Sequence, residues 1–348
     1  LNDKLNISLE AVCDSFSSLL WDIEYYKCGA FEVYIAASPR NIEIFQTGRI
    51  VGRDDDKEHF GLIESVELET DAEDGDYLII KGRFLMCLLE RRIIYPTLNF
   101  TSQTSYGAIV QKAVENNALA SGNRLIPGLK LGKIQGACWD TETKLQVSYD
   151  NLMEWVYTIC KKIGGTANIR LSKIAEEQYE MIFDLLQGED RSILQKENPH
   201  MVFSDSYNNL LSFTYFTDTS VKRNFAYVLG KGESEQRKRT TCFTNSEPAL
   251  LDRYEVYVDA KDISDEEQIA NETKPISEIE YEELLKEKGK QNLVPTKTKS
   301  ESQIAVQSTQ FQYGVDYFVG DFVTVEHHRF EIRQNKIQLI GMIESFDR

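Results

Sequence analysis

Short runs of alternating apolar and polar residues fill the first hundred positions, and this two-residue period restricts the fold of that region strongly. The runs LLWDIEYY and FEVYIAA flank the turn-like KCGA, which predicts a β-hairpin with Phe31, Val33 and Ile35 on one face. Further strands are predicted at NIEIFQ, GRIVG, GLIESVELE and DYLIIKG, and a short helix at FLMCLLERRII. So many strands at this spacing favour a small barrel or sandwich, which we assign to residues 1–98.

The period changes near residue 99. TSYGAIVQKAVENN and SYDNLMEWVYTICKKIGG each place their apolar residues on one helical stripe, and Gly164 is expected to end the second helix. TANIRLSK and YEMIFDLL then predict strands. We therefore expect an α+β domain at residues 99–202.

Strand patterns return after residue 202, but a long charged segment interrupts them. The strands on either side of that segment are too few to close a barrel alone, which predicts one β-domain with an insertion. We assign the second β-barrel to residues 203–232 and 303–348, ending in the hairpin RFEIRQNKIQLIGMIE, and the inserted α+β segment to 233–302. The insertion contains a predicted helix, ISEIEYEELLKEKG, with Ile279, Leu284 and Leu285 on its apolar stripe. The expected fold is α+β and mostly β, with two similar antiparallel β-barrels.

The stretch VDYFVGDFVTV predicts a strand, a tight turn and a second strand. Gly320 permits a sharp bend, and the carboxylate of Asp321 can accept hydrogen bonds from nearby backbone N–H groups. The stretch therefore predicts a scaffold turn and no active site.

Charge and composition exclude several classes of protein. The 348 residues carry a net charge of -17, whereas a protein that grips nucleic acid needs a basic surface. Lys81 and Arg83 break the longest apolar run, so no membrane span is expected, and the first residues show no signal-peptide pattern. Six scattered cysteines without a CxxC motif predict reduced thiols and synthesis in a cytoplasm.

The strong catalytic and metal-binding motifs are absent from the sequence. There is no HExxH, GxSxG or Walker loop, so no catalytic residue, metal or cofactor is expected. His327 and His328, bracketed by Glu326 and Glu331, resemble metal ligands, but neighbours on a strand point to opposite faces. We interpret them as a solvent-facing pair, and His59 and His200 as loop residues.

Carboxylates are abundant in two adjacent segments of the first β-domain. The loop contains Asp54, Asp55, Asp56 and Glu58, and the following hairpin contains Glu67, Glu69, Asp71, Glu73, Asp74 and Asp76. Exposed loop carboxylates rarely have the differing environments that catalytic pairs need. A solvated face and a functional acidic surface both remain open as interpretations.

Four motifs in series resemble the hub proteins of long non-contractile phage tails, over about Trp21 to Val325. They are WDIEYYKCGAFEVYI, GLIESVELETDAEDGDYLIIKGRFLMCLLERRII, RYEVYVDAKDI and VDYFVGDFVTV. The residues that carry the likeness are Trp21, Gly29, Phe31, Gly82, Arg83, Arg91, Arg92, Asp259, Asp316, Tyr317, Gly320 and Asp321.

The resemblance implies a structural protein of the tail tip or baseplate in the virion. Three chains would form a ring of six barrels that joins the tail tube to the tip. Its implied partners are two further copies of itself, a distal tail protein or tube ring above, the end of the tape-measure protein, and tip, fibre or lysin proteins below. Phage DNA would pass through without specific binding. The net charge suggests that the acidic loop and hairpin line that channel, the alternative being that these acids only keep the outer surface soluble.

Two functions from other classes remain as alternatives. One is a cell-wall hydrolase that uses paired carboxylates, and the other is a carbohydrate-binding adhesin, given 11% aromatic residues. Oligomeric state separates them from the hub, because a hub predicts a stable trimer.

Overall fold

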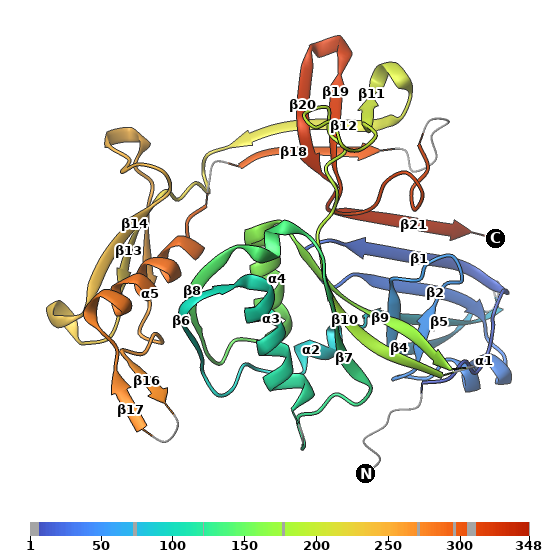
Figure 1. The fold of residues 1–348 in the computed structure, drawn as a ribbon. Coiled ribbons are helices and arrows are strands. Elements are labelled where there is room, and N and C mark those ends of the chain that lie inside the picture. Colours follow the sequence, from blue (N-terminus) through green and yellow to red (C-terminus); the bar gives the residue numbers. More distant parts are fainter. Residues whose placement is uncertain are drawn as a thin grey trace.

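The computed structural model describes residues 7–71, 75–120, 122–175, 178–269, 272–294, 297–304 and 311–347. Buried apolar side chains of these residues form four clusters, each beneath a different group of strands. Figure 1 shows the four groups: the first sheet, a mixed α and β region beside it, a sheet at the top and an outlying lobe.

The first group is a six-stranded antiparallel sheet in the order β21-β1-β2-β5-β4-β3. The strands are β1 (Phe16–Glu24), β2 (Ala30–Ala36), β3 (Ile50–Gly52), β4 (Phe60–Asp71), β5 (Gly75–Phe84) and β21 (Gly341–Asp347). The predicted hairpin is confirmed, and Phe31, Val33 and Ile35 are buried on one face. The sheet is curled but open, because β21 and β3 are its two edges.

The last strand, β21, differs from the prediction. The sequence predicted a closing hairpin, but β20 (Ile332–Gln338) pairs with β19 (Phe322–His327), whereas β21 pairs with β1. The physical reason is that alternation marks a strand without specifying its partner. The C-terminal strand thereby completes the first sheet instead of the second group.

A second difference concerns NIEIFQ, which was predicted as a strand. It lies largely in helix α1 (Pro39–Ile44), where Ser38 caps the first turn by accepting a hydrogen bond from the Asn41 N–H (3.0 Å). Proline at the first helical position has the backbone angle that a helix needs. These local signals outweigh the alternating pattern.

The mixed region packs three helices against a three-stranded sheet and a two-stranded ribbon over the largest buried cluster. The helices are α2 (Cys87–Glu90), α3 (Tyr106–Val114), with a π-helical turn at Glu115–Leu119, and α4 (Leu152–Ile163). The strands are β6 (Leu98–Ser105), β7 (Leu129–Ile134), β8 (Glu142–Val147), β9 (Thr166–Ala175) and β10 (Gln178–Leu186). Gly164 ends α4 in a left-handed conformation, as predicted.

The third group joins β11 (Val202–Ser204), β19 and β20 in one sheet and β12 (Leu210–Asp218) with β18 (Lys297–Ile304) in a ribbon. VDYFVGDFVTV forms only its second predicted strand, since the residues before Gly320 form turns. Strands β11 and β19 are parallel, so this group is not purely antiparallel.

The outlying lobe packs helix α5 (Glu278–Gln291) on a three-stranded sheet. Its strands are β13 (Phe225–Leu229), β14 (Arg239–Phe243) and β15 (Glu255–Asp259), and the hairpin β16 (Glu266–Ile269) and β17 (Glu272–Pro275) extends from it. Leu284 and Leu285 are buried on the predicted stripe, but Ile279 is 73% exposed. Strand β13, predicted within the second barrel, belongs to this lobe.

The chain is therefore a mostly β, α+β protein with a curled antiparallel sheet and few helices. The described strands of the third group form a small sheet and a ribbon, so the expected second barrel is not confirmed. Within the described residues, no helix is both long and apolar enough to cross a membrane.

Candidate functional site

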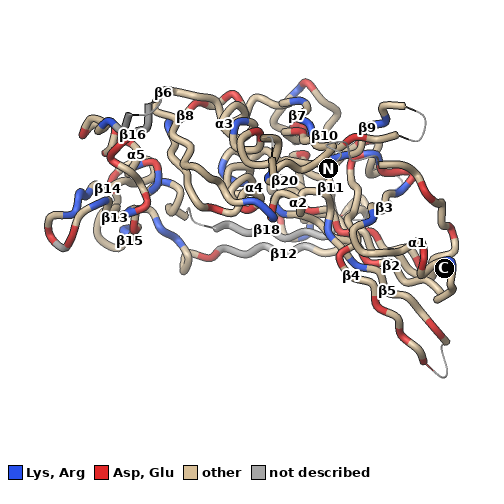
Figure 2. Tube along the Cα trace, turned by 90° about the horizontal axis from the view of Figure 1, so that it is seen from below, with Lys and Arg blue, Asp and Glu red and all other residues tan. Residues whose placement is uncertain are grey.

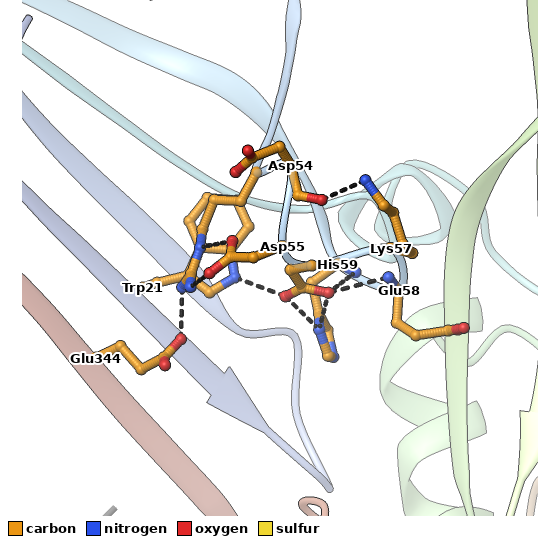
Figure 3. A network of polar contacts seen from close by, with 9 residues as sticks. Trp21, Asp54, Asp55, Lys57, Glu58, His59 and Glu344 are labelled. Atoms are coloured by element: carbon orange, nitrogen blue, oxygen red, sulfur yellow. Dashed lines mark hydrogen bonds and ion pairs between the residues drawn. The ribbon is translucent and has the colours of Figure 1, made fainter. Parts of the chain in front are cut away.

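The acidic loop between β3 and β4 is held to the sheet by a network of polar contacts, although part of its acidic surface stays exposed (Figure 3). One carboxylate oxygen of Asp56 accepts a hydrogen bond from the indole N–H of Trp21 (3.0 Å), and the other accepts from the backbone N–H groups of Glu58 and His59 (2.9 and 3.0 Å). The imidazole Nδ1 of His59 lies 2.9 Å from the same carboxylate. Burial raises the pKa of Asp56, but the contacts with His59 and the backbone N–H groups outweigh it and lower the pKa to about 2.

Arg53 joins this loop to the C-terminal strand. Its guanidinium donates to Asp55 (2.9 and 2.6 Å) and to Glu344 of β21, and it lies over the ring of Phe346 (4.6 Å). Asp55 and Asp56 are therefore used in holding the sheet edge. Asp54 and Glu58 remain exposed.

The β4–β5 hairpin extends well beyond the rest of the molecule (Figure 2). The side chains of Glu67, Glu69, Asp71 and Asp76 are exposed on it. The predicted site residues Glu73 and Asp74 lie outside the described residues.

Several residues of the four motifs form the core of the first sheet. Trp21 packs against Phe31, with ring centroids 5.8 Å apart, and both are buried. A Cβ at Gly29 would lie 2.2 Å from the carbonyl of Asp22, and one at Gly82 would lie 1.9 Å from the carbonyl of Leu62. These glycines are required by the close approach of neighbouring strands.

Gly320 and Asp321 form the scaffold turn that the sequence predicted. Gly320 has φ +105°, and Asp321 accepts hydrogen bonds from the backbone N–H groups of Glu189 (2.7 Å) and Phe318 (3.0 Å). The guanidinium of Arg191 donates to the same carboxylate (2.9 Å). Asp321 is buried, so these bonds join the third group to the end of the mixed region.

Two more residues of the four motifs, Arg83 and Asp259, form ion pairs. Arg83 forms ion pairs with Glu64 (2.8 Å) and Glu90 (2.7 Å). Asp259 forms one with Arg237 (2.6 Å).

Two further motif residues lie just before Gly320. Asp316 accepts a hydrogen bond from the backbone N–H of Gln312 (2.7 Å). Tyr317 is buried against Phe203, with ring centroids 5.4 Å apart.

Arg91 and Arg92 line a shallow depression of about 340 Å³ after α2, together with Ile93, Tyr95, Asn123 and Arg124. The sequence marked the first two arginines but not Arg124, because it lies in a loop between two elements without a recognisable motif. The depression brings together three guanidinium groups on an acidic protein.

The histidines make local contacts. His327 Nδ1 lies 3.3 Å from a carboxylate oxygen of Asp205, and His200 Nε2 lies 2.8 Å from the Gln195 carbonyl. In the described part of the chain, no three His, Cys, Asp or Glu side chains are grouped to hold a metal ion.

Comparisons with known proteins place these features in a wider context. The model of the Siphovirus ReqiPepy6 Gp37-like protein family matches residues 2–342. No curated protein sequence is significantly similar.

Solved structures with a similar fold include three tail proteins. One is a tail protein from Neisseria meningitidis MC58, with TM-score 0.59 and 13% identity over 99% of this chain and 91% of that one. Another is the 43 kDa tail protein of prophage MuSo2 from Shewanella oneidensis, with TM-score 0.57 and 10% identity over 98% of this chain and 93% of that one. The third is prophage tail protein gp18 from Listeria monocytogenes EGD-e, with TM-score 0.52 and 11% identity over 97% of this chain and 87% of that one.

Proposed function

Since this chain belongs to the Siphovirus ReqiPepy6 Gp37-like protein family, we propose that it is the hub of a phage tail tip. The predicted relation to siphophage tail proteins is confirmed by the family match. The finer proposal is a ring of three chains that joins the tail tube to the distal tip, with DNA passing through its centre. The observation that carries it is the family match over residues 2–342.

The open first sheet supports association between chains. Its edge strands β21 and β3 have hydrogen-bonding groups that a further strand or loop can cover. A ring would bring such edges against neighbouring chains, and a distal tail protein, the tape-measure terminus and tip proteins would cover its two ends. The division into two barrels, a mixed domain and an insertion remains part of this proposal.

An acidic channel wall also belongs to the proposal. Carboxylates repel the phosphates of passing DNA within about 8 Å at physiological salt. Asp55 and Asp56 are used in the network of Figure 3, which leaves Asp54, Glu58 and the hairpin acids as the candidates.

The proposed ring is tested by light scattering of the purified chain over a concentration series. We expect a trimer at high protein concentration, because contacts between identical subunits favour closed rings. A chain that stays monomeric, together with a copy number in tail particles that is not a multiple of three, would contradict the hub.

A further inference from the structure

The arginine pocket, defined as Arg91, Arg92 and Arg124, concentrates positive charge at one place on an acidic protein. Arg92 donates to the backbone carbonyl of Arg124 (2.8 Å), and Arg124 donates to the carbonyls of Tyr95 (2.7 Å) and Ile93. Among the described residues, none of the three forms an ion pair. The adjacent Glu90 is paired with Arg83, and this pairing and then the charge of Arg91 lower the pKa of Glu90.

The charges in the pocket repel one another. Burial and then the neighbouring Arg124 and Arg91 lower the pKa of Arg92 from its ordinary value. Other arginines, such as Arg53, Arg83 and Arg253, have carboxylate partners. Carboxylates outnumber basic groups in this chain, so a pocket with no ion pair among the described residues is suited to an anion from outside.

Exposed aromatic and apolar groups lie beside the arginines. Tyr95 and Ile93 line the pocket and are 54% and 49% exposed, and Tyr149 lies next to Tyr95 with ring centroids 6.2 Å apart. Tyrosine and arginine together are typical of protein–protein contacts. The chemistry of the pocket therefore fits an acidic protein segment.

The projecting β4–β5 hairpin supplies such a segment. Glu67, Glu69 and Asp71 alternate along β4, so they share one face, and Tyr77 lies opposite Glu69. Neither Glu67 nor Glu69 forms an ion pair within the described part of the chain. The hairpin reaches away from the body, where another molecule can contact it (Figure 2).

Glu69 lies near the tip of the hairpin and Glu67 about midway along it, whereas Arg91 follows its base, directly after α2. Strand β5 begins at the tip and ends at Phe84, three residues before α2, and its ten residues span about 30 Å. The hairpin cannot fold back to its own pocket because β5 is fixed between β2 and β4. Opposite charges at separate places on one chain favour a head-to-tail contact, and such contacts form rings when the rotation closes.

We propose that the acidic face of the β4–β5 hairpin of one copy docks on the arginine pocket of the next copy of this chain. This inference rests on the proposed ring and names the surfaces that build it. The contact pairs Glu67 and Glu69 with Arg91 and its neighbours, and it withdraws these two acids from the channel wall.

Charge exchange tests the contact. Arg91→Glu alone, and Glu67→Lys with Glu69→Lys alone, are expected to weaken association of the purified chain at least about tenfold, as reversed charges across an interface do. Combining all three changes in one chain places the exchanged charges opposite each other at every interface. The combined variant is expected to associate within about threefold of the natural chain, measured by sedimentation equilibrium. Raised salt should weaken the natural contact.

Matched controls change the same charge on other exposed positions. They are Lys161→Glu for the pocket, and Glu43→Lys with Glu142→Lys for the hairpin, and both should associate normally. A trimer that is insensitive to all the charge changes overturns this contact but leaves the hub proposal intact. A chain that is monomeric at every concentration overturns both. The contact is also overturned if Arg91→Glu leaves association of the chain unchanged but abolishes binding of a short DNA duplex. That result would identify phosphate as the occupant of the pocket.

Discussion

At the scale of single residues, this protein depends on backbone positions where a side chain has no room. Gly320 combines φ +105° with a neighbouring Tyr25 ring, whose Cε2 would lie 2.2 Å from an added Cβ. Tyr25 is also bonded to Gly188, whose N–H donates to the phenol oxygen (3.0 Å). The turn therefore fixes the contact between the first sheet and the third group.

Gly320→Ala should lower the free energy of unfolding by about 2–4 kcal/mol, because it adds steric overlap to left-handed strain. Gly48→Ala is the control, since Gly48 has φ +88° but no atom within 4 Å of the added Cβ. It should cost only about 1–2 kcal/mol. Urea denaturation measures both, and equal losses would show that Tyr25 moves aside freely.

Asp56 makes the free energy of unfolding depend on pH in the acid range. Its pKa of about 2 is below the ordinary 3.8, so its contribution to stability is present above pH 3.8 and is lost as the pH falls toward 2. Asp56→Asn should therefore lower the free energy of unfolding by about 2 kcal/mol at neutral pH and by progressively less below pH 3.8. Denaturation across pH checks this, with Asp54→Asn as the control, and a loss that does not vary with pH would contradict it.

At the scale of elements, local patterns predicted which segments are strands better than which strands pair. Helices α3 and α4 of the mixed region formed where apolar stripes and the Gly164 cap predicted them, because those signals lie within a few residues. Pairing of β21 with β1 joins residues more than three hundred positions apart, and no local pattern encodes it. The arginine pocket was partly missed for the same reason, since Arg124 reaches Arg92 only through the fold.

Deleting residues 340–348 tests this pairing by hydrogen exchange. The backbone N–H groups of β1 that face β21 should lose protection, whereas those of β20 should keep it because β20 pairs with β19. If β20 lost protection and β1 did not, the result would instead support the closing hairpin of β20 with β21 that the sequence predicted. The intact chain in the same buffer is the reference.

At the scale of the whole molecule, the proposed channel requires that the net charge of -17 be compatible with the passage of DNA. A basic wall would bind phosphates and release counterions, which slows transit, whereas an acidic wall leaves the strand hydrated and unbound. If Glu67 and Glu69 are used between chains, exposed Asp54 and Glu58 are the loop candidates that remain from the predicted set. Asp54→Lys with Glu58→Lys should then slow DNA ejection from particles at low salt, and the defect should fade as salt screens the charges.

The control pair, Glu233→Lys with Glu235→Lys, carries the same charge change in the outlying lobe, and particles with it should eject DNA normally. Equal ejection rates for all particles, or a ring whose inner surface is neutral or basic, would exclude the acidic wall.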